Sequence, residues 1–255
     1  MNTTLQLGDR TILRVGLGTN RVRDTPRDIE FIRNAVAAGL NFIDTAHLYT
    51  AGQSEKAIGA ALVGMSEKPV VATKGGYAPG QGRPDVLRAQ IDESLRRLQT
   101  DSIELFYLHR VDPETPLEDS LGAIKACQDK GMIRHAGLSA VTVEQIQRAR
   151  TVLRVSAVQN HYNLSERQYD DIVDYCEREG IVFVPYYPMR FSETPALRRV
   201  ARRLGATEAQ VALAWLLQRS SITAPIPGTL SLQHLKENLG ALDISLREED
   251  VHALR

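Results

Sequence analysis

The sequence repeats one pattern eight times: a short apolar run, then a longer segment in which apolar residues recur with helical spacing. Short apolar runs that alternate with amphipathic helices are typical of buried parallel strands joined by helical crossovers. Eight such units in about 250 residues predict an α/β fold, and specifically a (β/α)₈ TIM barrel. The expected strands are Val15–Leu17, Asn41–Asp44, Val70–Lys74, Ile103–His109, Ile133–Ser139, Ala157–Gln159, Val182–Pro185 and Thr223–Ile226.

The segments between these runs carry the signals of helix ends. Gly39 and Gly180 stand where a glycine closes a helix before a strand. Pro84 and Pro116 stand at helix starts, where a backbone N–H would have no intrahelical partner. The expected helices are Arg27–Ala38, Ser54–Val63, Val86–Leu98, Leu117–Lys130, Val143–Ala149, Gln168–Glu179, Ala196–Gln218 with a break at Gly205, and Leu232–Leu242.

A short N-terminal β-hairpin is expected ahead of the first unit, because Leu5 to Leu13 alternates around Gly8-Asp9. No Pro/Gly/Ser-rich linker interrupts the chain, so we expect one domain over residues 1–255. A doubly wound sheet is the alternative architecture. It normally has a glycine-rich phosphate loop after its first strand, and the stretch from Gly16 to Asn20 lacks the third glycine of that fingerprint.

The composition limits the classes of function. Lys+Arg and Asp+Glu both number 31, which argues against a general nucleic-acid binder. No apolar run reaches the ~20 residues needed to span a membrane, and the N-terminus lacks a signal-peptide pattern, so we expect a cytoplasmic protein. Nothing in the sequence indicates an obligate protein partner. Cys127 and Cys176 lie beside apolar residues in helical patterns and are expected to be buried thiols, not metal ligands.

Polar residues stand at the carboxyl ends of several predicted strands. They are Asp44, Lys74, His109, Ser139 and Gln159. In a barrel these strand ends meet at one face, where the chemistry of such folds collects. Any one of these side chains could instead be a structural hydrogen-bond anchor. Their joint placement indicates a site.

Four residues form a candidate proton-donor set: Asp44, Tyr49, Lys74 and His109. A free tyrosine has a pKa of about 10, and a nearby ammonium group lowers it. We therefore expect Lys74 to lower the pKa of Tyr49, Asp44 to keep Lys74 charged, and His109 to orient a substrate oxygen. Taken singly, each residue has other interpretations, including a Schiff-base role for Lys74.

At these positions the chain resembles the aldo-keto reductases, from Gly16 to about Leu242. Each motif is short, but the order and spacing of the set are specific. Two of the motifs look most like a bacterial branch that includes pyridoxal reductases. The motifs are Gly18-Thr19-Asn20, Asn41 to Ala46 with Tyr49, Thr73-Lys74, Leu108-His109-Arg110, Gly131 to Arg134, Gly137-Leu138-Ser139, Val158 to Leu164, Pro225 to Thr229, and Glu237-Asn238.

The resemblance implies a barrel that binds NADPH (NADP when oxidised) without a Rossmann domain and reduces a small-molecule aldehyde or ketone to the alcohol. It assigns Asp44, Tyr49, Lys74 and His109 as the catalytic tetrad, with Tyr49 as the general acid and no metal. The implied cofactor contacts are Ser139 and Gln159 at the nicotinamide carboxamide, Tyr186 under the ring, Gly18, Thr19 and Asn20 at the ribose, Arg190 at the pyrophosphate, and Gly228, Thr229, Ser231, His234, Glu237 and Asn238 at the adenosine phosphate end.

The chain also departs from the family pattern. Ala140 replaces a frequent asparagine after Ser139, and Gly228 and His234 stand where a lysine or arginine usually meets the 2′-phosphate, which leaves NADH open as a second cofactor. The expected walls of the substrate pocket are His47, Tyr77, Tyr162 and Phe191. A redox-sensing NADP(H)-binding subunit and a dedicated biosynthetic reductase or dehydrogenase remain as alternative functions.

Overall fold

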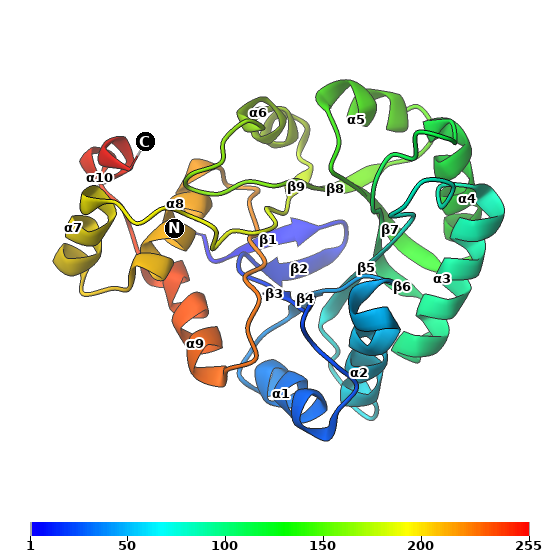
Figure 1. The fold of residues 1–255 in the computed structure, drawn as a ribbon, viewed down its shortest axis with the longest axis horizontal. Helices are drawn as coiled ribbons and strands as arrows, with labels where there is room; N and C mark the ends of the chain where they lie inside the picture. Colours follow the sequence, from blue (N-terminus) through cyan, green and yellow to red (C-terminus); the bar gives the residue numbers. More distant parts are fainter. Residues whose placement is uncertain (1, 255) are drawn as a thin grey trace.

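Seven parallel strands lie in chain order and curl into a barrel, with the helices in a ring outside them (Figure 1). The computed structural model describes residues 2–254, and the predicted (β/α)₈ barrel is confirmed. The terminal residues of the expected domain, Met1 and Arg255, lie outside the described residues. The barrel strands are β3 (Leu17–Gly18), β4 (Phe42–Asp44), β5 (Val70–Gly75), β6 (Ile103–Leu108), β7 (Ile133–Ser139), β8 (Val155–Gln159) and β9 (Val182–Phe183).

The eighth predicted strand, Thr223–Ile226, closes the barrel without forming a regular ladder. Gly16 N donates to Pro225 O at 2.9 Å, and Gly18 N donates to Pro227 O at 3.2 Å. On its other side the segment meets β9 through one isolated bridge. Pro225 and Pro227 have no N–H to return, so a full ladder is impossible here. The prediction of a regular strand was therefore wrong, although the position of the segment was right.

The helices cover the outer surface of the barrel close to their predicted positions. The long predicted stretch Ala196–Gln218 is two helices, and Gly205 ends the first of them in a left-handed conformation with φ of 62°. No helix within residues 2–254 is long and apolar enough to cross a membrane. The helices are α1 (Pro26–Ala37), α2 (Gln53–Leu62), α3 (Pro84–Leu98), α4 (Leu117–Asp129), α5 (Val143–Ala149), α6 (Asp170–Glu179), α7 (Pro195–Leu204), α8 (Glu208–Arg219), α9 (Leu232–Gly240) and α10 (Glu248–Ala253), with 3₁₀ turns η1 (Tyr49–Gly52) and η2 (Ala241–Asp243).

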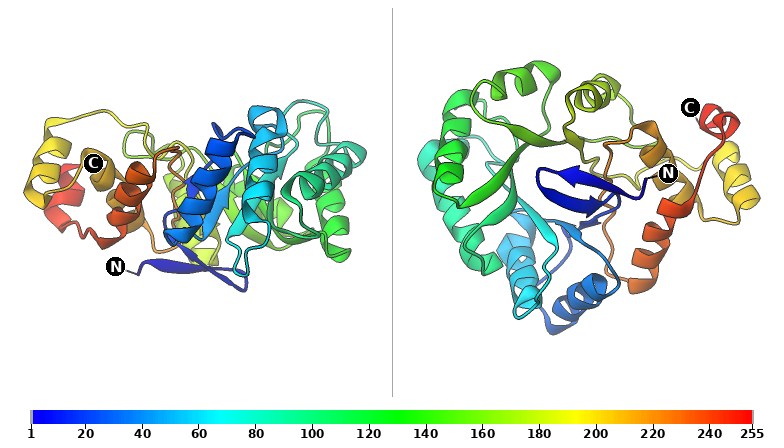
Figure 2. Two further views of the ribbon diagram at one scale, coloured as in Figure 1. Left: turned by 90° about the horizontal axis from the view of Figure 1, so that it is seen from below. Right: turned by 180° about the vertical axis from the view of Figure 1, so that it is seen from behind.

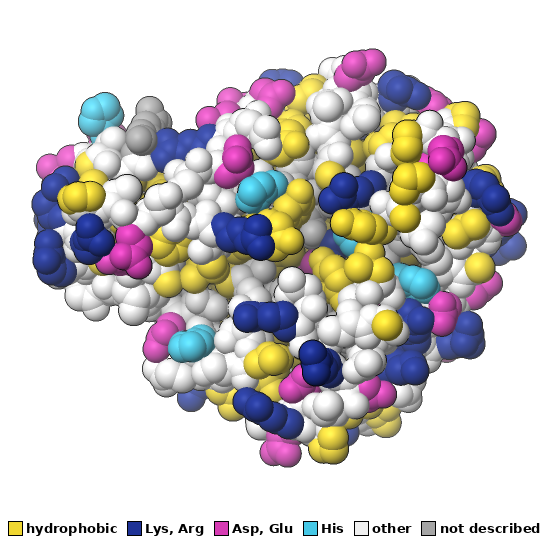
Figure 3. Space-filling view, viewed as in Figure 1, with side chains coloured by type: hydrophobic (Ala, Val, Ile, Leu, Met, Phe, Trp, Pro, Cys, Tyr) yellow, Lys and Arg dark blue, Asp and Glu magenta, His cyan; other side chains and the backbone are white. Residues whose placement is uncertain are grey.

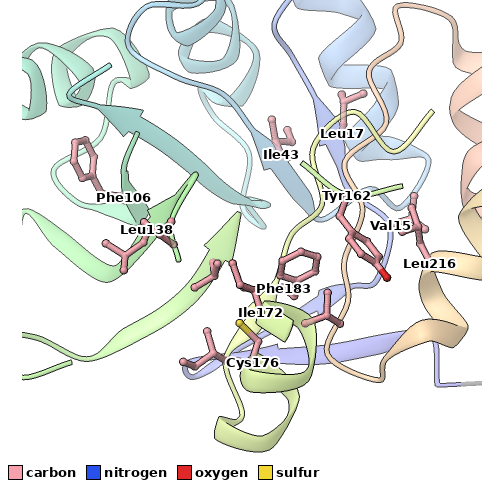
Figure 4. Packing of buried hydrophobic residues seen from close by; sticks show 14 of the residues in the cluster. Val15, Leu17, Ile43, Phe106, Leu138, Tyr162, Ile172, Cys176, Phe183 and Leu216 are labelled. Atoms are coloured by element: carbon pink, nitrogen blue, oxygen red, sulfur yellow. The ribbon is translucent and has the colours of Figure 1, made fainter. Parts of the chain in front are cut away.

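Strand alternation divides the apolar residues into an inner and an outer core. Successive side chains of a strand point to opposite faces, so every second residue enters the barrel. On β6, Leu105 and Tyr107 belong to the inner cluster, whereas Phe106 and Leu108 pack outward against the helices. Figure 4 shows part of the outer cluster, with Cys176 of α6 close to the strands. Both cysteines are free and buried, as the sequence predicted.

The N-terminal hairpin closes one end of the barrel. It consists of β1 (Thr4–Leu7) and β2 (Arg10–Leu13), paired antiparallel as predicted. Figure 2 shows the hairpin lying across the end of the barrel opposite the carboxyl ends of the strands. Leu7 and Ile12 are fully buried in the inner core. The hairpin does not cover the other end, where the parallel strands finish.

Directly after the hairpin, Arg14 is an almost fully buried cation that is bound by backbone carbonyl groups. Its guanidinium donates to Leu217 O and Ser220 O at 2.6 Å and to Thr223 O at 3.2 Å. It also donates to Asn2 O at 3.1 Å. These bonds connect the hairpin to the end of α8 and to the proline-containing closing segment. Arg14 thus holds together a seam where the strand ladder is incomplete.

We expect Arg14→Met to lower the free energy of unfolding by roughly 3 kcal/mol, because several buried carbonyl groups lose their donors. Urea unfolding followed by circular dichroism measures this change. Arg134→Met is the matched control: Arg134 makes an ion pair with Asp9 at the surface, and such pairs contribute at most about 1 kcal/mol. Equal losses in the two variants would contradict the role given to Arg14.

Candidate active site

A lysine and an aspartate form an ion pair inside the barrel mouth. Lys74 is fully buried and Asp44 is 1% exposed. The Nζ atom of Lys74 donates to Asp44 Oδ1 at 2.5 Å and to Thr45 O at 2.7 Å. The amide of Gln159 donates to the other carboxylate oxygen of Asp44 at 2.8 Å. Burial opposes the charge on Lys74, but the neighbouring Asp44 and Tyr49 raise the pKa of Lys74 above its ordinary value, so it stays an ammonium group.

Alternation along the strands places these charges inside. Lys74 follows the inward residues Val70 and Ala72 of β5 at intervals of two, and Asp44 follows inward Phe42 on β4 in the same way. The last inward position of each strand lies at the mouth, where a polar side chain can reach the cavity. The sequence therefore determines the site as soon as the strand register is known.

Tyr49 begins a tight turn that directs its ring at Lys74. Lys74 Nζ lies 5.0 Å from the centroid of the Tyr49 ring. The residues that follow, Thr50, Ala51 and Gly52, have φ values of 47°, 55° and 83°. Left-handed backbone is costly for threonine and alanine. The hydroxyl group of Thr50 donates to Val22 O at 2.7 Å and so holds the turn against the first barrel loop.

The pKa of Tyr49 differs from the expectation. Burial raises the pKa of Tyr49, and the opposing effect of Lys74 does not cancel it, while Asp44 adds a further upward contribution. The prediction that Lys74 brings the Tyr49 pKa below its ordinary value was therefore wrong, because it omitted the desolvation of the phenolate. Tyr49 is a neutral phenol that holds its proton at physiological pH. This state suits a proton donor.

His109 completes the set as a neutral imidazole. Burial, followed by the charges of Lys74 and Arg110, lowers the pKa of His109 to about 2. Its ring lies edge-on to the Tyr49 ring at a centroid distance of 6.2 Å. The buried Nδ1 atom has no hydrogen-bond partner within residues 2–254. The structure thus brings all four predicted catalytic side chains together.

Two neighbouring cavities open over this set. The first, of about 360 Å³, is lined by Tyr49, His109, Ser139 and Gln159 among others, and is called the active-site cavity below. The second, of about 380 Å³, extends from Asp44 and Tyr49 past the β3 loop and is called the side cavity. The two cavities share Asn20, Tyr49, Tyr186 and Tyr187 in their walls. Together they form one elongated depression, wide enough for an extended ligand.

Most of the predicted cofactor residues line this depression. Tyr186 faces both cavities, and one face of its ring stacks on His161 with a centroid distance of 5.4 Å. Gln159 uses its amide nitrogen on Asp44, and its amide oxygen has no side-chain partner within residues 2–254. The predicted residues that line the depression are Gly18, Thr19, Asn20, Ser139, Gln159, Tyr186, Arg190 and Gly228.

Of the residues predicted for the adenosine end, Gly228 lines the side cavity and the others lie outside both cavities. Thr229 and Ser231 precede α9, and His234, Glu237 and Asn238 lie on this helix. Thr229 Oγ1 accepts from Ser231 N at 3.0 Å, and Ser231 Oγ accepts from the N–H of His234 at 3.4 Å as the cap of this helix. Glu237 is bound to Gln233, and Asn238 is 6% exposed. Their contact with a cofactor stays a prediction.

The predicted substrate walls are only partly correct. Tyr77 lines the active-site cavity. His47 instead turns outward and lies 2.7 Å from Glu93. Tyr162 is 1% exposed and packs in the core beside Trp215, and Phe191 lies outside both cavities. Sequence could not show these orientations, because loop residues have no fixed alternation.

Ala140 occupies a conformation that would suit the asparagine expected here from the family resemblance. It lines the active-site cavity with φ of 55°. Asparagine adopts left-handed backbone more readily than alanine does. An asparagine at position 140 would fit the same turn and would add a polar side chain to the cavity wall.

Two arginines near the site were missed by the sequence reasoning. Arg21 lines the side cavity and donates to Gly228 O at 2.8 Å, which bridges the first and last barrel loops. Arg97 of α3 donates to His47 O at 2.9 Å and to the buried Glu55 at 3.2 Å. Glu55 in turn accepts a bond of 2.6 Å from the hydroxyl of Thr73. Arg21 directly follows the predicted turn Gly18-Thr19-Asn20, so its place in the sequence was a usable signal.

Arg97 therefore braces the loop that carries Tyr49. Its guanidinium also lies against Gly52, where a Cβ atom would come within 2.3 Å of it. Through Glu55 and Thr73 the same brace reaches the strand that carries Lys74. Tyr49 and its ammonium neighbour Lys74 are thus both held from one outer helix.

Comparison with known proteins identifies the family. The model described as the aldo/keto reductase family matches residues 14–255, so the chain belongs to that family. It is accordingly an oxidoreductase, and the resemblance noted in the sequence is confirmed. An uncharacterized oxidoreductase of Schizosaccharomyces pombe is 38% identical over 96% of this chain and 87% of its own length. Pyridoxine 4-dehydrogenase of Escherichia coli is 34% identical over 99% of this chain and 97% of its own length.

Solved structures of aldo-keto reductases have the same fold as this chain. A thermostable aldo-keto reductase in complex with the inhibitor epalrestat superposes with a TM-score of 0.92 at 31% identity and covers 98% of each chain. An aldo/keto reductase from Klebsiella pneumoniae in complex with NADP and acetate gives a TM-score of 0.89 at 26% identity over 100% of this chain and 94% of its own.

We expect Arg97→Met to lower the free energy of unfolding by about 3 kcal/mol, because Glu55 is left as a buried and uncompensated carboxylate. Arg96→Met is the control on the same helix, since Arg96 is exposed and should change stability by less than about 0.5 kcal/mol. Urea unfolding at neutral pH measures both. If Arg97→Met loses no more free energy of unfolding than Arg96→Met does, the contacts of Arg97 with Glu55 and His47 do not stabilise the fold.

His109 should make stability depend on pH. The folded state holds the pKa of His109 at about 2, whereas an unfolded histidine titrates near pH ~6.5. Below about pH 6.5 the unfolded state binds the additional proton, so this group removes stability as pH falls. When the pH is lowered from 7.5 to 5, the free energy of unfolding of His109→Asn should rise by about 2 kcal/mol relative to that of the parent protein. Urea unfolding at both values tests this, and a pH-independent difference would contradict it.

Proposed function

We propose that the protein reduces an aldehyde or ketone to the alcohol with NADPH, and that Tyr49 supplies the proton. The observation that carries this proposal is the neutral phenol of Tyr49 beside the fully buried ammonium group of Lys74, at the mouth of the barrel. A carbonyl oxygen that gains a hydride becomes an alkoxide, which such a pair stabilises and then protonates.

The depression fits a nicotinamide cofactor. Its elongated shape joins a polar end, with Ser139 and the free amide oxygen of Gln159, to a side cavity that holds Arg21 and Arg190. The side of the Tyr186 ring away from His161 is available for stacking an aromatic ring. Two guanidinium groups suit a pyrophosphate. When bound there, the cofactor would supply the hydride.

The residues of the chain would divide the remaining work. His109 is neutral, so its Nε2–H can donate a hydrogen bond to the carbonyl oxygen and orient it without adding a charge. Tyr49 then transfers its phenolic proton to the developing alkoxide. The phenolate left behind is stabilised by Lys74, which Asp44 holds in place. A proton from solvent restores Tyr49, and the reverse steps oxidise an alcohol.

The substrate class is narrowed by the relatives. Because a 34% identical relative is named pyridoxine 4-dehydrogenase, pyridoxal belongs among the first aldehydes to test beside simple aromatic aldehydes. NADPH is the first cofactor to test. NADH should be tested beside it, because positions 228 and 234 are glycine and histidine and not a lysine or arginine that would bind the 2′-phosphate of NADPH. The two buried free thiols favour a reducing compartment, the cytoplasm, as the place of action.

Tyr49→Phe should lower kcat for aldehyde reduction by roughly 10²- to 10⁴-fold, because the ring keeps its packing but loses the proton. The loss of nicotinamide absorbance measures turnover, and quenching of the single tryptophan on titration with NADPH measures binding, which should persist. Tyr175→Phe on α6 is the matched control, since Tyr175 bonds Arg150 on the outer surface. Unchanged turnover in Tyr49→Phe would refute the assignment of the general acid.

A further inference from the structure

The active-site cavity has an unbalanced charge. Among the residues that line it, Arg110 is the one that carries a full charge, because His109 is neutral, and no aspartate or glutamate of the described chain lines the cavity. Figure 3 shows the mouth of the barrel, with several Lys and Arg side chains around the middle of the face. A neutral aldehyde would gain nothing from a cation at this place.

The Arg110 side chain forms one wall of the cavity. Arg110 directly follows His109, and its backbone N–H donates to Gly76 O at 3.1 Å. Its guanidinium lies 4.6 Å from the centroid of the Tyr77 ring, which is itself 4.9 Å from the His109 ring. Guanidinium, phenol and imidazole therefore stand in a row that leads to the reacting end of the cavity. Stacking on Tyr77 restricts the guanidinium plane but leaves its N–H groups free.

Arg110 differs from Arg21 and Arg97 in what it binds, and resembles Arg190 of the side cavity, whose guanidinium lies 3.9 Å from the centroid of the Tyr187 ring. Arg97 is paired with Glu55 and Glu93, and Arg21 donates to a backbone carbonyl. For Arg110 the structure of residues 2–254 provides the Tyr77 ring and no acidic partner. A guanidinium beside a ring can still form two parallel hydrogen bonds with a carboxylate.

We propose that Arg110 is a specificity-determining residue that binds an anionic group of the substrate, so that the preferred substrate is an aldehyde or ketone carrying a carboxylate. This inference rests on the proposed carbonyl reduction, because it places the anion at one end of the cavity and the carbonyl at His109 and Tyr49. A phosphate monoester offers the same chemistry and is a separate arm of the test.

The cofactor phosphates are a competing ligand for Arg110, and the geometry separates the two. Arg21 and Arg190 line the side cavity, whereas Arg110 lines the active-site cavity alone. A pyrophosphate in the side cavity would lie beyond Tyr49 and Tyr186, which stand in the wall between the two spaces. Removing the charge of Arg110 should therefore change the KM for the aldehyde and leave the KM for NADPH in place.

The test compares each acid with its neutral isostere. With NADPH as the cofactor, kcat/KM is measured for 3- and 4-formylbenzoate, for the matching 3- and 4-formylbenzamide, and for 4-formylphenyl phosphate. Each substrate is tested with the parent protein, Arg110→Gln, Arg110→Lys and Arg83→Gln. Arg83 is the matched control, because it is exposed at the start of α3 and its removal changes the net charge equally. We expect the parent to prefer the acids, and Arg110→Gln to reduce that preference roughly tenfold to a hundredfold, mainly through KM.

Arg110→Lys should keep part of the preference, Arg83→Gln all of it, and added salt should weaken it. The proposal is overturned if Arg110→Gln keeps the parent ratio of acid to amide, if the parent prefers the amides, or if the variant changes the KM for NADPH instead. If the kcat/KM of the parent protein for 4-formylphenyl phosphate, divided by that of Arg110→Gln, exceeds the same quotient for the formylbenzoates, the choice of carboxylate is overturned. Calorimetric binding of benzoate against benzamide tests the anion site without turnover, so a parent protein that oxidises no NADPH would defeat the proposed function separately.

Discussion

A lysine and an aspartate share the dry interior of the barrel mouth, and the rest of the site is arranged around that contact. Removing two ions from water is expensive, and their attraction compensates only when the geometry is good and the remaining hydrogen-bonding capacity is used. Here Thr45 O accepts a second hydrogen bond from Lys74, and the Gln159 amide donates to the second oxygen of Asp44. The ammonium group is therefore fixed, which allows it to act on the neighbouring phenol.

The balance between burial and charge sets the protonation state of each side chain that we propose to be catalytic. Tyr49 keeps its proton because desolvation of the phenolate exceeds the attraction of Lys74, and His109 stays uncharged because burial and two cations oppose its protonation. The site thus combines one buried ion pair with two neutral donors. Such a site can stabilise a negative oxygen that forms during reaction without holding an anion beforehand.

Much of this arrangement could be predicted from sequence, for a simple geometric reason. Strand periodicity of two places Asp44 and Lys74 inside the barrel once their strands are recognised, and parallel strands bring their ends to one face. The prediction failed where neighbours in space decide the outcome. Pro225 and Pro227 removed the donors of an expected strand, His47 turned to Glu93, and burial reversed the expected shift of the Tyr49 pKa. Arg97 acts through a helix remote in sequence, which no local pattern reveals.

The turn after Tyr49 has a consequence for how this protein can evolve. Thr50 and Ala51 hold left-handed backbone that glycine would adopt with less strain. Glycine at position 50 would also remove the hydroxyl that fastens the turn to Val22. At position 51 no side-chain hydrogen bond opposes the change, so glycine there would release backbone strain without that loss. The turn can therefore be relaxed at one of its two strained positions and not at the other.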